Sequence, residues 1–114
     1  MKIYISGAIT GTDDYLARFE RAEQKLRERG EKEIINPAKV CASLPETLTH
    51  EEYMKICLAM LSLCDEVYLI PPWTDSKGVR KELEFAIDNN KHVEVMTNDN
   101  KRSDSNNRSR KSGG

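Results

Sequence analysis

The sequence has little of what marks secreted, membrane or zinc-binding proteins. Its three cysteines are an odd number without CxxC spacing, which argues against a disulfide framework and a zinc knuckle. No apolar run approaches the roughly 20 residues that cross a bilayer. Met1-Lys2 leads directly into a strand-like run, without a signal peptide. We therefore expect a protein of the reducing cytoplasm that has no membrane partner.

Neither positive nor negative charge dominates the sequence. The formal net charge is −1, with acidic and basic residues mixed along the chain. Without a basic face, specific or general binding to nucleic acid is not expected. The two histidines, His50 and His92, have no partner at metal-ligand spacing, so we predict structural or solvated histidines, no metal and no cofactor.

What is present is an alternation of apolar strand-like runs and amphipathic helical patterns. The pattern predicts strands at 2–6, 33–36, 66–70 and 92–96, helices at about 14–29, 49–63 and 77–89, and a helical turn near 38–43. Asp13 or Asp14 is expected to cap the first helix, Gly30 to end it, and Thr49-x-x-Glu52 to form a capping box. Residues 1–96 form one predicted domain, and the polar stretch 97–114 a disordered tail.

This order of elements predicts an α/β fold with a parallel sheet and right-handed crossovers. We expect a flavodoxin-like (Rossmann-like) three-layer sandwich with four or five parallel strands, in the order 2-1-3-4. In such sheets the ligand binds beyond the carboxyl ends of the strands, where the strand order reverses. The loops that arrive there are residues 7–12 and 71–78. The sequence therefore predicts a site between the first and third strands.

The first of these loops has the glycine spacing Gly7-x-x-x-Gly11. It is neither the dinucleotide GxGxxG nor a P-loop. A ligand-binding loop and a tight strand-to-helix turn explain this glycine spacing equally well. Tyr4, three residues earlier, is expected in the core, with a hydroxyl that can point into the crevice.

The second loop leads from Trp73 into the helix that carries Ser76, Gly78 and Glu82. Ser76 suits both a helix cap and a phosphate contact. The Glu82 carboxylate can reach back to the crevice, but spacing alone favours an ordinary exposed residue. Glu84 faces another side of the helix and is not its partner. Trp73 has two alternative roles, stacking on a base or sugar and covering the sheet edge.

The helix at 49–63 has a wide apolar face, formed by Tyr53, Ile56, Met60 and Leu63, with Cys57, Leu61 and Cys64 beside them. This face exceeds what one small sheet is expected to bury. A homodimer or other homo-oligomer through it is a hypothesis that the sequence leaves open.

Several of these segments occur in the order typical of a known superfamily. They are Ile3–Gly11, Asn36-Pro37-Ala38, Tyr53-Met54-Lys55, Cys64-Asp65, Pro72-Trp73 and Ser76–Glu82. Together they resemble the nucleoside 2-deoxyribosyltransferase-like superfamily, closest to a branch of small bacterial and phage proteins. The resemblance covers nearly all of residues 2–95.

The resemblance implies an enzyme that cleaves or exchanges the N-glycosidic bond of deoxynucleosides or their 5′-monophosphates. It implies that Glu82 is the nucleophile, with Tyr4 beside it. Ser76 would contact a 5′-phosphate, as in the N-hydrolase branch. The resemblance also implies that Gly7, Ile9 and Gly11 lie under the base and sugar.

One position departs from the active enzymes of that superfamily. They carry an aspartate eight residues before the aspartate that opens the third strand, and this chain has Cys57 there. Three functions therefore stay open at this point. They are an N-glycosidic hydrolase or transferase, a non-catalytic nucleotide-binding or sensing module, and an interaction protein that keeps only the fold.

Overall fold

The structure is a computed structural model that describes residues 1–9, 14–71 and 76–97. Its elements in chain order are β1 (Ile3–Ser6), α1 (Tyr15–Glu28), β2 (Ile34–Ile35), α2 (Pro37–Cys41), α3 (His50–Ser62), β3 (Glu66–Leu69), α4 (Lys77–Asp88) and β4 (His92–Val95). Apart from Thr97, the predicted tail lies outside the described residues.

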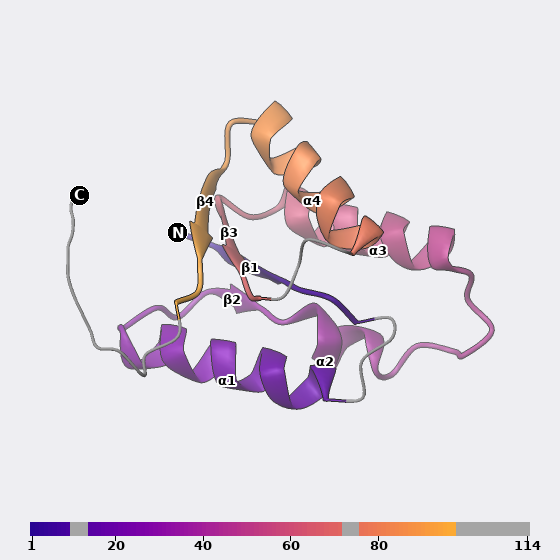
Figure 1. Ribbon diagram of the computed structural model, residues 1–114, viewed down its shortest axis with the longest axis horizontal. Helices are drawn as coiled ribbons and strands as arrows, with labels where there is room; N and C mark the ends of the chain where they lie inside the picture. The colour runs from indigo at the N-terminus through magenta and orange to yellow at the C-terminus, as the bar shows by residue number, and fades with distance from the viewer. Residues whose placement is uncertain (10–13, 72–75, 98–114) are drawn as a thin grey trace.

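The four strands form one parallel sheet in the order β2-β1-β3-β4. Helix α1 covers one face, and α3 and α4 cover the other, which gives three layers (Figure 1). This confirms the predicted flavodoxin-like α/β fold and its strand order. The order reverses between β1 and β3, because β2 lies on one side of β1 and β4 lies beyond β3.

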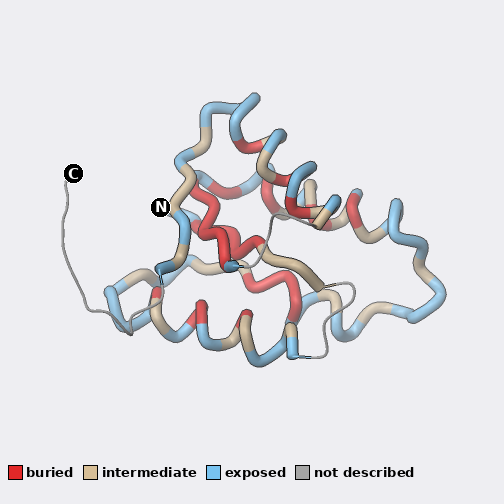
Figure 2. The backbone as a smooth tube through the Cα atoms, viewed as in Figure 1, coloured by how far each residue is buried: buried red, intermediate tan, exposed pale blue. Residues whose placement is uncertain are grey.

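Strands β1 and β3 are buried along their whole length and form the centre of the molecule (Figure 2). Successive residues of a strand point to opposite faces, so these strands supply two cores. The core on the α1 side contains Ile3, Ile5, Phe19, Ala22, Leu26, Ala38, Tyr68 and Ile70. The core on the α3 and α4 side contains Tyr4, Cys57, Leu61, Cys64, Val67, Leu69, Val79 and Ala86.

The helix ends agree with the sequence in most cases. Gly30 follows α1 with a φ of 97°, which favours glycine, and Thr49 and Glu52 form the predicted capping box of α3. Asp14 occupies the N-cap position of α1, but its side chain makes no capping hydrogen bond. Its carboxylate instead accepts a bond of 3.2 Å from Nε of Arg18, so side-chain capping by Asp14 was wrong.

All four strands are shorter than predicted, β2 by two residues and the others by one. Strand β2 is an edge strand of two residues rather than 33–36, because Asn36 turns into α2 and Pro37 has no N–H for the ladder. Strand β4 ends at Val95, although the Met96 N–H still donates to the Leu69 carbonyl at 2.7 Å.

The apolar face of α3 is rotated relative to the prediction. Met54, Cys57 and Leu61 are its buried residues, and the predicted Leu63 follows the helix with 67% of its surface exposed. The apolar spacing alone could not reveal which flank of a wide stripe meets the sheet. The homodimer through this face stays a prediction.

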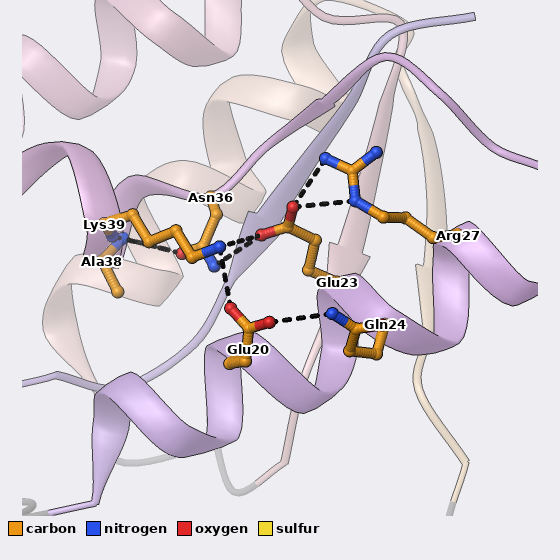
Figure 3. Close-up of polar contacts among 7 residues, drawn as sticks. All are labelled: Glu20, Glu23, Gln24, Arg27, Asn36, Ala38 and Lys39. Atoms are coloured by element: carbon orange, nitrogen blue, oxygen red, sulfur yellow. Dashed lines mark hydrogen bonds and ion pairs between the residues drawn. The ribbon is translucent and has the colours of Figure 1, made fainter.

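A buried polar group ties α1 to the start of α2. The Glu23 carboxylate accepts hydrogen bonds from Asn36 Nδ2 at 3.1 Å and from Arg27 Nη2 at 2.6 Å, and Lys39 lies 3.3 Å from it (Figure 3). Asn36 Oδ1 accepts from the backbone N–H of Ala38 at 3.1 Å. Asn36 therefore caps α2 and joins it to α1.

Replacing Asn36 with alanine is expected to lower the free energy of unfolding by about 1–2 kcal/mol, because the cap is lost and a buried Glu23 oxygen loses a donor. Urea denaturation measures this change. The control is Lys55→Ala on the exposed side of α3, with an expected effect of about 0.5 kcal/mol or less. Equal effects of the two substitutions would contradict this account of Asn36.

Candidate active site

The site begins where β1 and β3 end side by side. Ser6 is in register with Leu69, and the Ile70 N–H donates to the Ser6 carbonyl at 2.8 Å. Gly7 and Pro71 leave the sheet just beyond these residues. The loops after the two strands therefore start at the same edge of the sheet, at the reversal of strand order.

Helix α4 carries an acidic residue within its buried stripe. Val79, Glu82 and Ala86 are the buried residues of the helix, and they lie at steps of three and four. Glu82 is only 6% exposed. The interpretation of Glu82 as an ordinary exposed residue, which spacing alone favoured, was wrong.

The Glu82 carboxylate is held by two hydroxyl groups of β1. The Tyr4 hydroxyl donates to Oε2 at 2.6 Å, and the Ser6 hydroxyl donates to Oε1 at 2.6 Å. Tyr4 and Ser6 are two residues apart, so their side chains lie on the same face of the strand. Each oxygen of the buried carboxylate thus has its own donor.

Burial and hydrogen bonding act in opposite directions on this group. Burial raises the pKa of Glu82, and the bonds from Ser6 and Tyr4 lower it, with a net rise above the ordinary value. Burial also raises the pKa of Tyr4 well above its ordinary value, with a further rise from the negative charge of Glu82. The Tyr4 phenol therefore stays protonated and acts as a donor.

Cys57 lies beside this pair on α3. Its thiol lies near the Tyr4 hydroxyl, and burial raises the pKa of Cys57 to about 12. A thiol with such a pKa is neutral at physiological pH and is a weak hydrogen-bond donor. Cys57 contacts Cys41 of α2 on its other side, and both cysteines are free thiols.

Ser76 and Gly78 stand at the start of α4, on the same helix as Glu82. Ser76 is the N-cap, and its hydroxyl accepts from the Val79 N–H at 3.2 Å. A serine hydroxyl can accept and donate at once, so capping is compatible with a phosphate contact. Gly78 lies one helical turn before Glu82, about 6 Å along the helix axis.

Gly7 has a clear packing reason. A Cβ atom at this position would clash with the Ile70 side chain and lie 3.3 Å from Phe19. Ile9 is half-buried against the core on the α1 side, and Arg18 Nη2 donates to the Ala8 carbonyl at 2.8 Å. The structure thus gives Gly7 a packing role beside Ile70, while its proposed place under a substrate is untested.

Gly11 and Trp73, both predicted to contact substrate, lie outside the described residues. Among the predicted site residues that the structure describes, Tyr4 and Glu82 meet directly. Ser6 was missed by the sequence analysis, which placed it only in the strand. The available signal was its position two residues after Tyr4, on the same face of β1.

Other titratable residues agree with the roles expected for them. The Lys2 N–H donates to Asp65 Oδ2 at 2.9 Å, at the opposite end of β1 from Glu82, which fits a structural aspartate. His50 and His92 are exposed. Within the part of the chain that the structure describes, no three His, Cys, Asp or Glu side chains gather as a metal site, and no helix is long and apolar enough to span a membrane.

The fold is that of the 2-deoxyribosyltransferases. The structure superposes on the 2-deoxyribosyltransferase of the psychrotolerant bacterium Bacillus psychrosaccharolyticus with a TM-score of 0.66 and 23% sequence identity, over 83% of this chain and 71% of that chain. That enzyme is described as a biocatalyst for the synthesis of nucleosides. At this identity the likeness establishes the fold. No protein of curated function matches the sequence.

The family profile described as "Domain of unknown function (DUF4406)" matches residues 1–95. The chain belongs to this family, and it shares the fold of the 2-deoxyribosyltransferase described above. The resemblance drawn from the sequence is therefore confirmed.

The buried carboxylate is expected to make stability depend on pH. Because the pKa of Glu82 is raised in the folded state, this group stabilises the fold at low pH and loses that contribution as pH rises through its folded pKa. Glu82→Gln carries no charge to bury. Its stability relative to the wild type is therefore expected to increase over the pH range in which the buried carboxyl group ionises, above the ordinary value of 4.5.

Urea denaturation of both proteins across this range measures the difference, with Glu84→Gln on the exposed side of the same helix as the control. This control removes one exposed carboxylate from the same helix. A Glu82→Gln protein that becomes progressively less stable than the wild type as pH rises would refute this assignment.

Proposed function

We propose that this protein is an N-glycosidic bond hydrolase or transferase that acts on deoxynucleosides or their 5′-monophosphates, with Glu82 as the nucleophile. The observation that carries the proposal is the buried Glu82 carboxylate, held by Tyr4 and Ser6 at the carboxyl end of β1. Burying a carboxylate in the apolar stripe of a helix lowers the stability of the fold. Costly arrangements of this kind are typical of functional sites. The fold shared with a 2-deoxyribosyltransferase supports the same conclusion.

The chemistry follows that of retaining glycosidases. An N-glycosidic bond breaks through a transition state with oxocarbenium character at the anomeric carbon. Glu82 attacks that carbon, the electron pair of the C–N bond leaves with the base, and a glycosyl ester forms. Water or a second base then displaces Glu82 and restores the carboxylate. Tyr4 and Ser6 hold the carboxylate in one orientation throughout.

The start of α4 supports a monophosphate as the substrate. The first N–H groups of a helix have no partner within the helix, and they favour an anion. Ser76 adds a hydroxyl at this end. A 5′-phosphate bound there would leave the sugar one helical turn away, beside Glu82.

Departure of the base requires a proton, and Cys57 is a poor source of one. General acid help contributes about 10²–10⁴-fold to such steps, and a neutral thiol with a pKa of about 12 provides little of it. The cysteine at position 57 therefore favours the second candidate function, a nucleotide-binding or sensing module that uses the same crevice without turnover.

Base release from purified protein is expected with at least one deoxynucleoside or deoxynucleoside 5′-monophosphate, and Glu82→Ala is expected to lower it by at least about 10³-fold. Chromatography of free bases measures the release, and a thermal shift with the same ligands measures binding. Ser76→Ala should raise KM for the monophosphate more than for the nucleoside. Glu84→Ala serves as the control on the same helix.

A different result would establish the binding module instead. The protein would bind a nucleotide without turnover, Glu82→Ala would leave the affinity unchanged, and Ser76→Ala would weaken it. If the protein neither binds nor cleaves any of these ligands, the third function applies, that of an interaction protein that keeps only the fold.

Cys57→Asp is expected to increase base release by about 10²-fold, because it places a carboxyl group where the active enzymes of the superfamily are expected to have one. The matched control is Cys57→Asn, which has the same shape without a titratable group. The rates of both variants and the wild type are compared with one substrate at several pH values. Equal rates of the Asp and Asn variants would show that this position does not limit the reaction.

A further inference from the structure

The second hydroxyl on Glu82 comes from a residue that the resemblance does not assign. Ser6 is 1% exposed and donates to Oε1 at 2.6 Å. Buried polar groups are almost always hydrogen-bonded, so the hydroxyl needs a partner. Serine hydroxyls in strands can bond to nearby backbone groups. Here the partner is a carboxylate that lies 76 positions away in the chain.

Two donors restrict a carboxylate more than one donor does. The terminal torsion of a glutamate is broad, so a carboxylate held through one oxygen can still swing about that bond. Tyr4 and Ser6 hold different oxygens from one strand, which fixes the plane of the group. That strand is buried and paired on both sides, so the two donors have fixed positions relative to each other.

We propose that Ser6 is a positioning residue that fixes the plane of the Glu82 carboxylate and favours its ionised form. This inference rests on the proposed function for its effect on turnover, but its effect on Glu82 itself does not depend on any reaction. An ionised carboxylate accepts both hydroxyls, whereas a protonated one must direct its own O–H elsewhere. Each donor therefore favours the charged form, and that is the form that attacks a sugar carbon.

The other titratable groups around Glu82 do not compete with this effect. They are Tyr4 from β1, Cys57 from α3 and Cys41 from α2, and burial raises the pKa of each. All three are neutral over the range in which a carboxylate titrates. A change in the titration of Glu82 after substitution of Ser6 therefore reports on the lost hydrogen bond.

The test replaces Ser6 with alanine, which removes the donor, and with cysteine, a near-isostere that is a weak donor. The control is Ser62→Ala, which removes an exposed hydroxyl bonded to the Ala59 carbonyl at 2.6 Å. Carbon-13 NMR of protein labelled at the glutamate carboxyl carbons follows Glu82 with pH, without substrate. Glu82→Gln identifies its signal.

The pKa of Glu82 is expected to rise in Ser6→Ala, to rise less in Ser6→Cys, and to stay unchanged in Ser62→Ala. For turnover, kcat in Ser6→Ala should fall by roughly tenfold or more with little change in KM, and the acidic limb of the pH profile should move to higher pH. If the alanine variant does not fold, the cysteine variant decides the question by the same shift.

Unchanged titration of Glu82 in both folded variants would overturn the proposal. A shifted titration in a protein that cleaves no nucleoside would uphold the role of Ser6 at Glu82 and would contradict only the proposed reaction. The two claims can therefore fail separately.

Discussion

The site depends on a carboxyl group that is buried between a helix and a strand. Glu82 occupies a position in α4 that the helix otherwise uses for apolar side chains, and 94% of its surface is removed from water. An isolated carboxylate there would be strongly destabilising. The hydroxyls of Tyr4 and Ser6 offset part of this cost, because each donates to a separate oxygen at 2.6 Å. The arrangement lowers the stability of the fold and holds the carboxylate in one preorganised orientation.

The fold brings these groups together from distant parts of the sequence. In the order β2-β1-β3-β4, β1 and β3 are the central strands, and the chain leaves their carboxyl ends toward opposite faces of the sheet. Helix α4 follows β3 and packs on the face where Tyr4 and Ser6 point. Its start, with Ser76 as the N-cap, lies one to two turns from Glu82. One helix thus supplies both a carboxylate and an anion-favouring end.

The architecture could be predicted from the sequence because local signals determine it. Apolar runs, Gly30 and the Thr49–Glu52 capping box indicate the elements, and their alternation favours the parallel sheet. The burial of Glu82 could not be predicted from spacing, since charged neighbours surround it in sequence and only the distant strand supplies its donors. Ser6 was missed for the same reason. The rotated face of α3 shows that periodicity does not reveal which side of a wide apolar stripe meets the sheet.

The central claim is that Glu82 attacks the sugar. An electron-withdrawing fluorine at C2 of the sugar slows both steps through an oxocarbenium-like transition state, so a glycosyl ester on the nucleophile can accumulate. The direct measurement is peptide mass spectrometry of the protein after incubation with 2′-fluoro analogues of the nucleosides and monophosphates that it binds. The account predicts one fluorinated glycosyl group on Glu82. A glycosyl group on another residue, or base release with a Glu82→Ala protein at the wild-type rate, would contradict it.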